Sequence, residues 1–160
     1  MLKTCLKTLG RRFTHFARRD EQGTQLLELA IVLPLLVLFF AATAEFGRFF
    51  YTYSTLAKAA RAGARYAMTR PLNSANLGQA KSLAVFGDQF GGCSGTPVVP
   101  NLQCANVDIQ QSTSGGVQVV TARITGYQYQ PLFDLGKLTG SASASLRIDV
   151  SPSVAMKYIN

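Results

Sequence analysis

The sequence predicts an α+β protein, with one long N-terminal helix whose first half could cross a membrane and a small, antiparallel β-rich head. Three observations predict this fold. Residues 26–44 form a nearly uninterrupted apolar run, residues 45–70 contain no proline, and residues 141–150 alternate between polar and apolar. Only 15% of the 160 residues are charged, well below the usual value of about a quarter. A substantial part of the chain is therefore expected to avoid water.

The first 23 residues form a basic leader. They hold six basic and two acidic residues, a net charge of +4 out of the formal +8 of the whole chain. A basic segment of this kind can indicate nucleic acid, an anionic membrane surface or a topology signal. The apolar run that follows favours a topology signal. The excess of basic residues before the run predicts a cytoplasmic N-terminus and an exported head.

The apolar run has the length of a membrane helix. Residues 26–44 are apolar except for Glu28 and Thr43, and the run reaches 21 residues when it is counted on to Phe46. A helix needs about 20 residues to cross the hydrocarbon core of a bilayer. A buried helix of a soluble protein would need a larger partner core than the rest of the chain offers. We therefore expect a transmembrane helix over residues 24–46, with Pro34 tolerated inside it.

Glu28 is the most unusual residue of the run. A carboxylate inside an apolar span is costly unless it is paired, so it usually marks function. A cut between Gly23 and Thr24 would create an α-ammonium at Thr24, one helical turn from the Glu28 carboxylate and on the same face. The alternative is a glutamate at the membrane interface whose carboxyl group reaches water.

These residues resemble a known signal. A basic leader that ends in glycine, a glutamate at the fifth position after it and an apolar helix are similar to the class III signal of type IV pilin-like proteins. The continuation resembles the TadE-like pseudopilins of the tight-adherence (Tad/Flp) pilus systems, through residues 27–36, 45–48 and 60–67. The resemblance is strong over residues 18–70 and weak afterwards. Thr24 departs from the aromatic residue that many type IV pilins carry there.

The resemblance implies a pilin-like fold and a structural role. It implies that a prepilin peptidase removes residues 1–23 by cutting after Gly23, and that Glu28 takes the place of the pilin glutamate in subunit docking. It further implies a minor pseudopilin that helps to initiate or build a Tad type IVc pilus, which supports surface adhesion and biofilm formation. The implied partners are the prepilin peptidase, other pilins or pseudopilins, the inner-membrane assembly platform and membrane lipid. The implied location is the bacterial inner membrane, with a single pass and a periplasmic head, or an extracellular pilus after assembly.

Residues 47–70 are expected to continue the helix on the exported side, until Pro71 stops it. Small residues recur there at steps of three and four: Ala57, Ala60, Gly63, Ala64 and Ala67. Such residues let helices approach closely. The simpler interpretation of these small residues is that they form the core-facing surface of the helix, against which the strands of the head pack. The basic residues on the adjacent face are most simply solvated, and contact with lipid head groups is the alternative.

Residues 71–160 are expected to form the head. Residues 71–95 indicate a short helix and a loop, residues 106–111 and 117–127 two strands around a turn, and residues 141–150 a third strand. Cys93 and Cys104 lie in a Gly/Pro-rich stretch on the exported side, where a disulfide can persist. We favour this disulfide over two unpaired loop cysteines. The strand order stays open.

The composition argues against an enzyme. The single histidine, His15, lies in the basic leader, and the exported acidic residues are scattered without a carboxylate pair or metal-ligand spacing. We therefore expect no catalytic residues, no metal and no cofactor. The aromatic residues between 46 and 53 suggest an interfacial belt or head packing rather than base stacking, so we expect no nucleic-acid partner.

Two alternatives remain for the leader. The triplet at residues 42–44 has the small-x-small form that ordinary signal peptidase accepts, which would release a periplasmic domain starting at Glu45. An uncut leader would give a signal-anchored membrane protein with a periplasmic binding domain. The long basic leader, Glu28 and Pro34 argue against a secretion signal.

Overall fold

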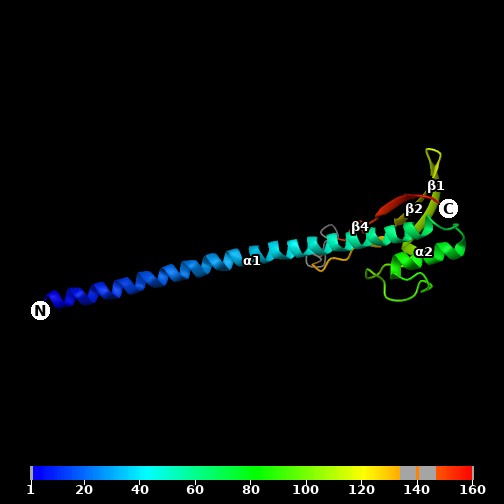
Figure 1. Ribbon diagram of the computed structural model, residues 1–160. Coiled ribbons are helices and arrows are strands. Elements are labelled where there is room, and N and C mark those ends of the chain that lie inside the picture. Colours follow the sequence, from blue (N-terminus) through cyan, green and yellow to red (C-terminus); the bar gives the residue numbers. More distant parts are fainter. Residues whose placement is uncertain (1, 134–139, 141–146, 160) are drawn as a thin grey trace. The chain divides into compact units, whose positions relative to one another are not determined.

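The computed structural model describes residues 2–133, 140 and 147–159, and it describes side chains from Gly23 onward. The chain divides into two compact units, residues 1–44 and 45–160. Helix α1 (Leu2–Ala67) contributes residues to both units, and all strands belong to the second (Figure 1). The predicted α+β class is confirmed.

The first unit is helical over its described residues, and its apolar side chains between residues 23 and 40 are exposed. Every residue from 23 to 40 is exposed, and the large side chains among them, such as Ile31 and Phe40, keep 69% and 75% of their surface accessible. Pro34 lies inside the helix. By length and composition, the part of α1 from Gly23 to Ala67 could cross a membrane. The prediction of a long N-terminal helix with this capacity is confirmed.

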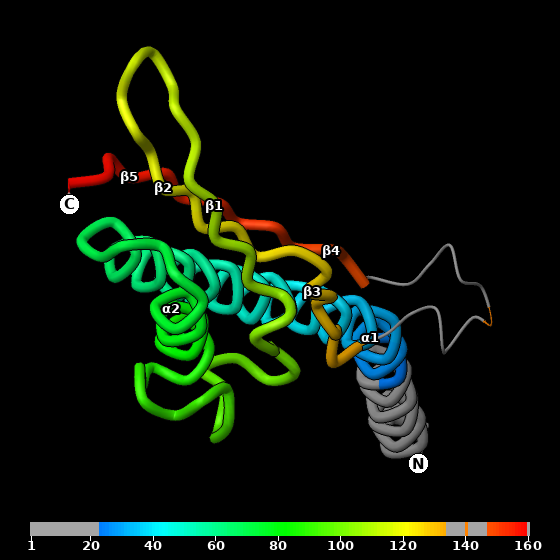
Figure 2. The backbone as a smooth tube through the Cα atoms, turned by 90° about the vertical axis from the view of Figure 1, so that its right-hand side faces the viewer, coloured from blue at the N-terminus to red at the C-terminus, as the bar shows by residue number. Residues whose placement is uncertain are grey.

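The second unit is built around the end of α1. Its buried face carries residues at helical spacing, with Leu56, Ala60, Ala64 and Ala67 almost fully buried. Helix α2 (Ser74–Phe86) and the sheet both pack on this face of α1 (Figure 2). The three elements share one hydrophobic core.

The main sheet has three antiparallel strands in the order β1-β2-β5: β1 (Val107–Ser114), β2 (Val117–Ile124) and β5 (Ser153–Lys157). The inward face of β2 supplies Val120, Ala122 and Ile124 to the core. Along β5, half-buried residues alternate with exposed ones. The sheet therefore has the one covered and one solvated face that is typical of antiparallel sheets.

The β1–β2 hairpin forms where the sequence predicted two strands and a turn. The strands pair from Val107↔Ile124 to Ser114↔Val117, which leaves only Gly115 and Gly116 for the turn. Both glycines have positive φ, 58° and 79°, the geometry of a two-residue turn that suits the strand twist. The first strand therefore runs three residues further than the predicted end at residue 111.

The last part of the sheet differs from the prediction. Residues 141–146 of the predicted third strand lie outside the described residues, and β4 (Asp149–Val150) pairs with β3 (Tyr127–Gln128) in a separate two-stranded sheet. The third strand of the main sheet is β5, which the sequence analysis missed. Its alternation is short, and Pro152 separates it from the stronger pattern before it.

The predicted short helix after residue 71 is α2. The side chain of Asn73 caps its N-terminus by accepting a hydrogen bond of 2.8 Å from the Asn76 N–H. Gly87, with φ 73°, ends the helix in the left-handed conformation that favours glycine. A short 3-10 turn, η1 (Cys104–Asn106), then leads into β1.

Candidate functional site

The predicted processing site lies on an accessible part of α1. Gly23, Thr24 and Glu28 are all exposed, and a Cβ built on Gly23 meets no atom within 4 Å. Thr24 and Glu28 are four residues apart in one helix, so their side chains share a face. In the uncut chain the Thr24 nitrogen is a peptide N–H, and a cut after Gly23 would convert it into an ammonium.

A second carboxylate, Glu45, is buried in the head. Only 7% of Glu45 is accessible, although it follows directly on the exposed apolar run. Its Oε1 accepts a hydrogen bond of 2.5 Å from the Tyr129 hydroxyl. The Leu132 N–H lies 3.2 Å from Oε1 and 3.1 Å from Oε2, and the Phe133 N–H lies 3.4 Å from Oε2. The carboxylate therefore satisfies backbone donors of a segment far along the chain.

The surroundings of Glu45 are aromatic. Tyr129 is 4% accessible, and its ring meets that of Phe49 edge-on with centroids 5.4 Å apart. Burial raises the pKa of Tyr129 to about 12, and the hydrogen bond to Glu45 adds to this rise, while Arg48 opposes it. The phenol is therefore a stable hydrogen-bond donor to Glu45 at neutral pH.

Sequence reasoning missed this network, because it assigned no partner to the Glu45 carboxylate. The partners of Glu45 lie 84 to 88 residues away, where no local pattern connects them. One available signal was helical spacing. Glu45 and Phe49 continue the stripe of Leu56, Ala60 and Ala64 that faces the core.

The small residues of α1 lie inside the head. Ala60, Gly63, Ala64 and Ala67 are buried and Ala57 is half-buried. A Cβ built on Gly63 would lie 3.2 Å from both the Ala80 carbonyl oxygen and the Ala84 Cβ, and 3.7 Å from the Ile109 side chain. The stripe therefore faces α2 and β1 within the chain.

The structure contains the disulfide between Cys93 and Cys104, with an S–S distance of 2.00 Å and a Cα–Cα distance of 6.0 Å. It joins the loop after α2 to the start of η1. This loop carries two residues with positive φ that are not glycine, Cys93 and Asn101. A cross-link is well suited to holding such a segment, which has little regular structure of its own.

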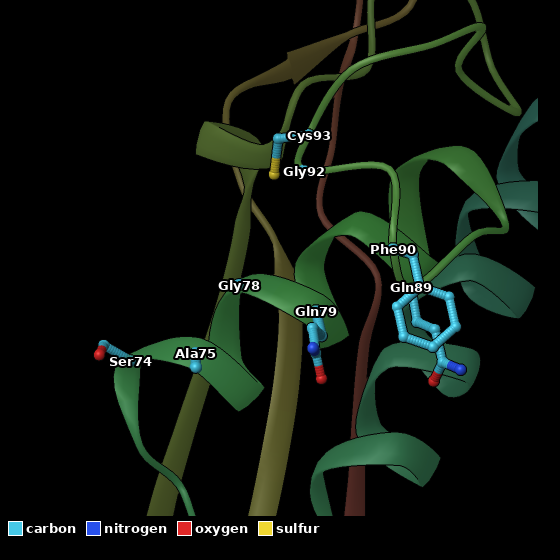
Figure 3. A pocket seen from close by; sticks show the side chains of 8 residues that line it. All are labelled: Ser74, Ala75, Gly78, Gln79, Gln89, Phe90, Gly92 and Cys93. Atoms are coloured by element: carbon cyan, nitrogen blue, oxygen red, sulfur yellow. The ribbon is translucent and has the colours of Figure 1, made fainter.

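An open hollow lies beside the disulfide. It lies between the first turns of α2 and the loop at residues 89–93, with Ser74 and Ala75 at one end and Gln89 and Phe90 at the other (Figure 3). None of its eight lining residues carries an acid or a base. Among the residues that the structure describes, no group of three or more His, Cys, Asp or Glu side chains could hold a metal ion.

Comparison with known protein families finds one matching segment, which contains the exposed apolar run and the residues on both sides of it. Residues 23–65, less than half of the chain, match the model of the TadE-like protein family. This segment is similar to the TadE-like family, and we call it the TadE-like segment. The TadE-like segment begins at Gly23, contains both Glu28 and Glu45, and ends near the end of α1. Comparison with curated proteins and with solved structures gives no significant match.

The family match and the structure are consistent with each other. The family match suggests a protein associated with the Tad pilus machinery. The part of α1 from Gly23 to Ala67 contains the matched residues and could span a membrane, which is consistent with a membrane-anchored component of that machinery. Tyr129 and the disulfide of the head lie outside the matched residues.

Proposed function

We propose that the chain is a minor pseudopilin, a non-enzymatic structural subunit that helps to initiate and build a Tad type IVc pilus. One observation supports this role above all. The TadE-like match begins at Gly23, and the helix that follows exposes its apolar side chains and carries a glutamate five residues after that glycine. A surface of this kind needs a cover of lipid or of other apolar helices. The membrane would supply lipid before assembly, and neighbouring subunits would supply apolar helices in the pilus.

In this proposal a prepilin peptidase cuts between Gly23 and Thr24. The exposure of both residues and the open space around Gly23 suit such a cut. The mature chain then starts with the ammonium of Thr24, four residues before Glu28. The basic leader stays in the cytoplasm and the head lies in the periplasm.

Glu28 acts when one subunit meets another. A lone carboxylate in hydrocarbon is costly, and an ammonium at the same depth offsets much of that cost. The Thr24 ammonium of a neighbouring pilin or pseudopilin provides that partner at the assembly platform. The subunit leaves the membrane laterally and supports surface adhesion and biofilm formation through the pilus. No cofactor or metal takes part.

The secretion-signal alternative would cut the chain inside the segment that matches the family. A cut after Ala44 would split the TadE-like segment, which spans residues 23–65. It would also make the buried Glu45 the first residue of the mature chain and place a new ammonium beside its carboxylate. We therefore favour the cut after Gly23.

The intact mass and N-terminal sequence of the protein from native membranes test the proposal. A start at Thr24 is the expected result. A start at Glu45, with the protein in the soluble periplasmic fraction, would establish the secretion signal instead. An intact leader on all molecules would indicate a signal-anchored protein, and either of these results would overturn the pseudopilin assignment.

Two glycine variants make the cleavage test specific. Gly23→Leu is expected to block processing in cells that contain the prepilin peptidase, because the peptidase needs a small residue before the cut. Gly47→Leu is the matched control, since Gly47 is also an exposed glycine of α1 with no atom near its built Cβ. Normal processing of Gly23→Leu would contradict the proposed cleavage of the leader after Gly23.

A further inference from the structure

We infer that one end of the head is a lipid-contact surface that lies in the interfacial layer of the bilayer. This surface, here called the apolar rim, consists of Phe46, Phe50, Leu132, Phe133 and Ile148. All five are exposed, from 45% at Phe133 to 66% at Leu132. The inference rests on the proposed membrane anchoring of the first unit, and it adds a second contact made by the head.

The helical part of the rim lies within reach of the bilayer by distance alone. Residues 25–44 provide about 20 positions, enough for the hydrocarbon core, so Phe46 and Phe50 follow its end by about 3 and 9 Å at 1.5 Å per residue. The interfacial layer on each side is roughly 5–8 Å thick. Helical side chains tilt towards the N-terminus of their helix, which here means back towards the apolar run. Both aromatic rings therefore fall at the depth of the head groups.

The other part of the rim is held to the same end of the head by Glu45. The carboxylate accepts hydrogen bonds from the Leu132 and Phe133 N–H groups, so the backbone of these residues lies against the side chain that directly follows the apolar run. Ile148 is tied to the same place, because its carbonyl oxygen accepts a hydrogen bond of 2.9 Å from the Tyr129 N–H. Segments distant in sequence thus expose apolar side chains around one buried carboxylate.

The chemistry of the rim fits a lipid interface better than a second protein chain. Aromatic residues are enriched at the level of the head groups, where an apolar ring meets a polar layer. The exposed Arg48 follows within the same turn of α1 and supplies a cation for lipid phosphate. The rim is also continuous in sequence with the exposed apolar run, which is already the candidate membrane span. We therefore assign the bilayer interface as the occupant of this surface.

The chain contains no tryptophan, so a single introduced tryptophan reports on one position. Leu132→Trp provides a rim reporter. Phe39→Trp provides a span reporter in the apolar run, as a control for membrane insertion, and Phe90→Trp provides a distal reporter on an exposed residue beside the hollow near α2. Each full-length variant is reconstituted as a monomer in nanodiscs whose lipids carry bromine either near the head group or near the middle of the acyl chain.

We expect head-group bromine to quench the rim reporter more strongly than mid-chain bromine does, and the distal reporter to be quenched by neither. The span reporter is expected to show the opposite depth preference. If bromine quenched the rim reporter no more than the distal reporter, while it quenched the span reporter, the lipid contact of the rim would be contradicted. The membrane anchor would still be supported. Absence of quenching at the span reporter would instead contradict the anchor. A blue-shifted emission of the rim reporter that bromine does not quench would mean that protein covers the rim, which also overturns the inference.

A second variant tests whether Glu45 holds the loop at the bilayer. Glu45→Ala is expected to reduce head-group quenching of the rim reporter in the Leu132→Trp background. The same substitution in the Phe39→Trp background should leave the quenching of the span reporter unchanged. An unchanged near-UV circular dichroism spectrum of the variant checks that loss of quenching is not simply loss of the fold. Unchanged quenching of the rim reporter would exclude Glu45 as the positioning residue.

Discussion

The carboxylate of Glu45 accepts a hydrogen bond of 2.5 Å from the hydroxyl of Tyr129, across 84 residues of sequence. Glu45 lies in α1 at the point where the exposed apolar residues end. Tyr129 directly follows β3, which pairs with β4, so the bond connects this part of α1 to the strand pair. A buried carboxylate is tolerated only when donors satisfy it, and here a phenol and two backbone N–H groups do so. Glu45 is therefore a structural anchor of the head.

The first prediction concerns the energy of this pair. Glu45→Ala is expected to lower the free energy of unfolding of the head by about 3 kcal/mol, because buried donors lose a charged acceptor. Tyr129→Phe should cost about 1.5 kcal/mol, and the double variant less than the sum, because the two residues share one bond. Denaturant unfolding of the full chain in detergent, followed by the near-UV circular dichroism of the tyrosines, measures these values.

Glu28→Gln is the matched control for that cycle, since Glu28 is an exposed glutamate of the same helix. It should leave the unfolding of the head unchanged. Strict additivity of Glu45→Ala and Tyr129→Phe would show that the hydrogen bond contributes no coupling, and the anchor role of Glu45 would then rest on its backbone contacts alone.

The second prediction is a loss of stability in alkali. The pKa of Tyr129 is raised from 10.0 to about 12, first by burial and then by the hydrogen bond to Glu45. Between these values the folded chain keeps a proton that the unfolded chain has released, so the free energy of unfolding falls as the pH rises. The contribution is complete below pH 10 and lost towards pH 12. Burial also raises the pKa of Tyr127, which acts in the same direction.

Unfolding curves collected at several pH values across this range measure the effect. Tyr129→Phe should flatten part of the pH dependence, whereas Tyr51→Phe, which removes an exposed hydroxyl, should leave it unchanged. An alkaline loss of stability that is the same in wild type and Tyr129→Phe would assign it to other groups.

Patterns that are local in sequence predicted the parts of the fold that depend on local physics. The apolar run and the Gly23–Glu28 spacing are visible within single stretches of sequence. The β1–β2 turn was predicted within residues 112–116, and it is made by Gly115 and Gly116, both with positive φ. The short helix predicted within residues 71–95 came from the helical spacing of its apolar residues and is α2, and the structure adds Asn73 and Gly87 as its caps.

Features that depend on distant residues were missed. Glu45 looked like an interruption of the apolar run, since nothing near it indicates that Tyr129 and Leu132 satisfy its carboxylate. The strand order β1-β2-β5 was open for the same reason, because β5 pairs with β2 from the far end of the chain. A short edge strand with two half-buried residues, Val154 and Met156, gives too weak a period to identify alone.

The third prediction concerns the close approach of α1 and α2. Gly63→Leu is expected to destabilise the head by about 1–3 kcal/mol, because its Cβ alone would lie 3.2 Å from the Ala80 carbonyl oxygen and the Ala84 Cβ. Gly47→Leu in the same helix has open space around its Cβ and should be neutral or slightly stabilising. Chemical denaturation of both variants compares them, and equal stabilities would show that the two helices separate without cost.

The fourth prediction concerns the disulfide. Replacing Cys93 and Cys104 together by serine is expected to lower the free energy of unfolding by about 3 kcal/mol, the chain-entropy value for a loop of this size. Cys93→Ser alone should migrate on non-reducing gels like the reduced wild type. A mobility difference between reduced and non-reduced wild type that persists in Cys93→Ser would contradict the pairing.

The last prediction tests Glu28 in assembly. Glu28→Ala should leave cleavage after Gly23 largely intact, because the change lies beyond the cut, but it should impair incorporation, because the neighbouring Thr24 ammonium loses its counter-charge in hydrocarbon. Gln25→Ala is the matched control, since Gln25 is an exposed polar residue near the same end of the TadE-like segment. Quantitative immunoblots of membrane and sheared pilus fractions, together with pilus counts per cell, measure both steps. If Glu28→Ala and Gln25→Ala gave the same pilus number and the same distribution between fractions as the wild type, the docking role of Glu28 would have to be abandoned, even with processing at Gly23 established.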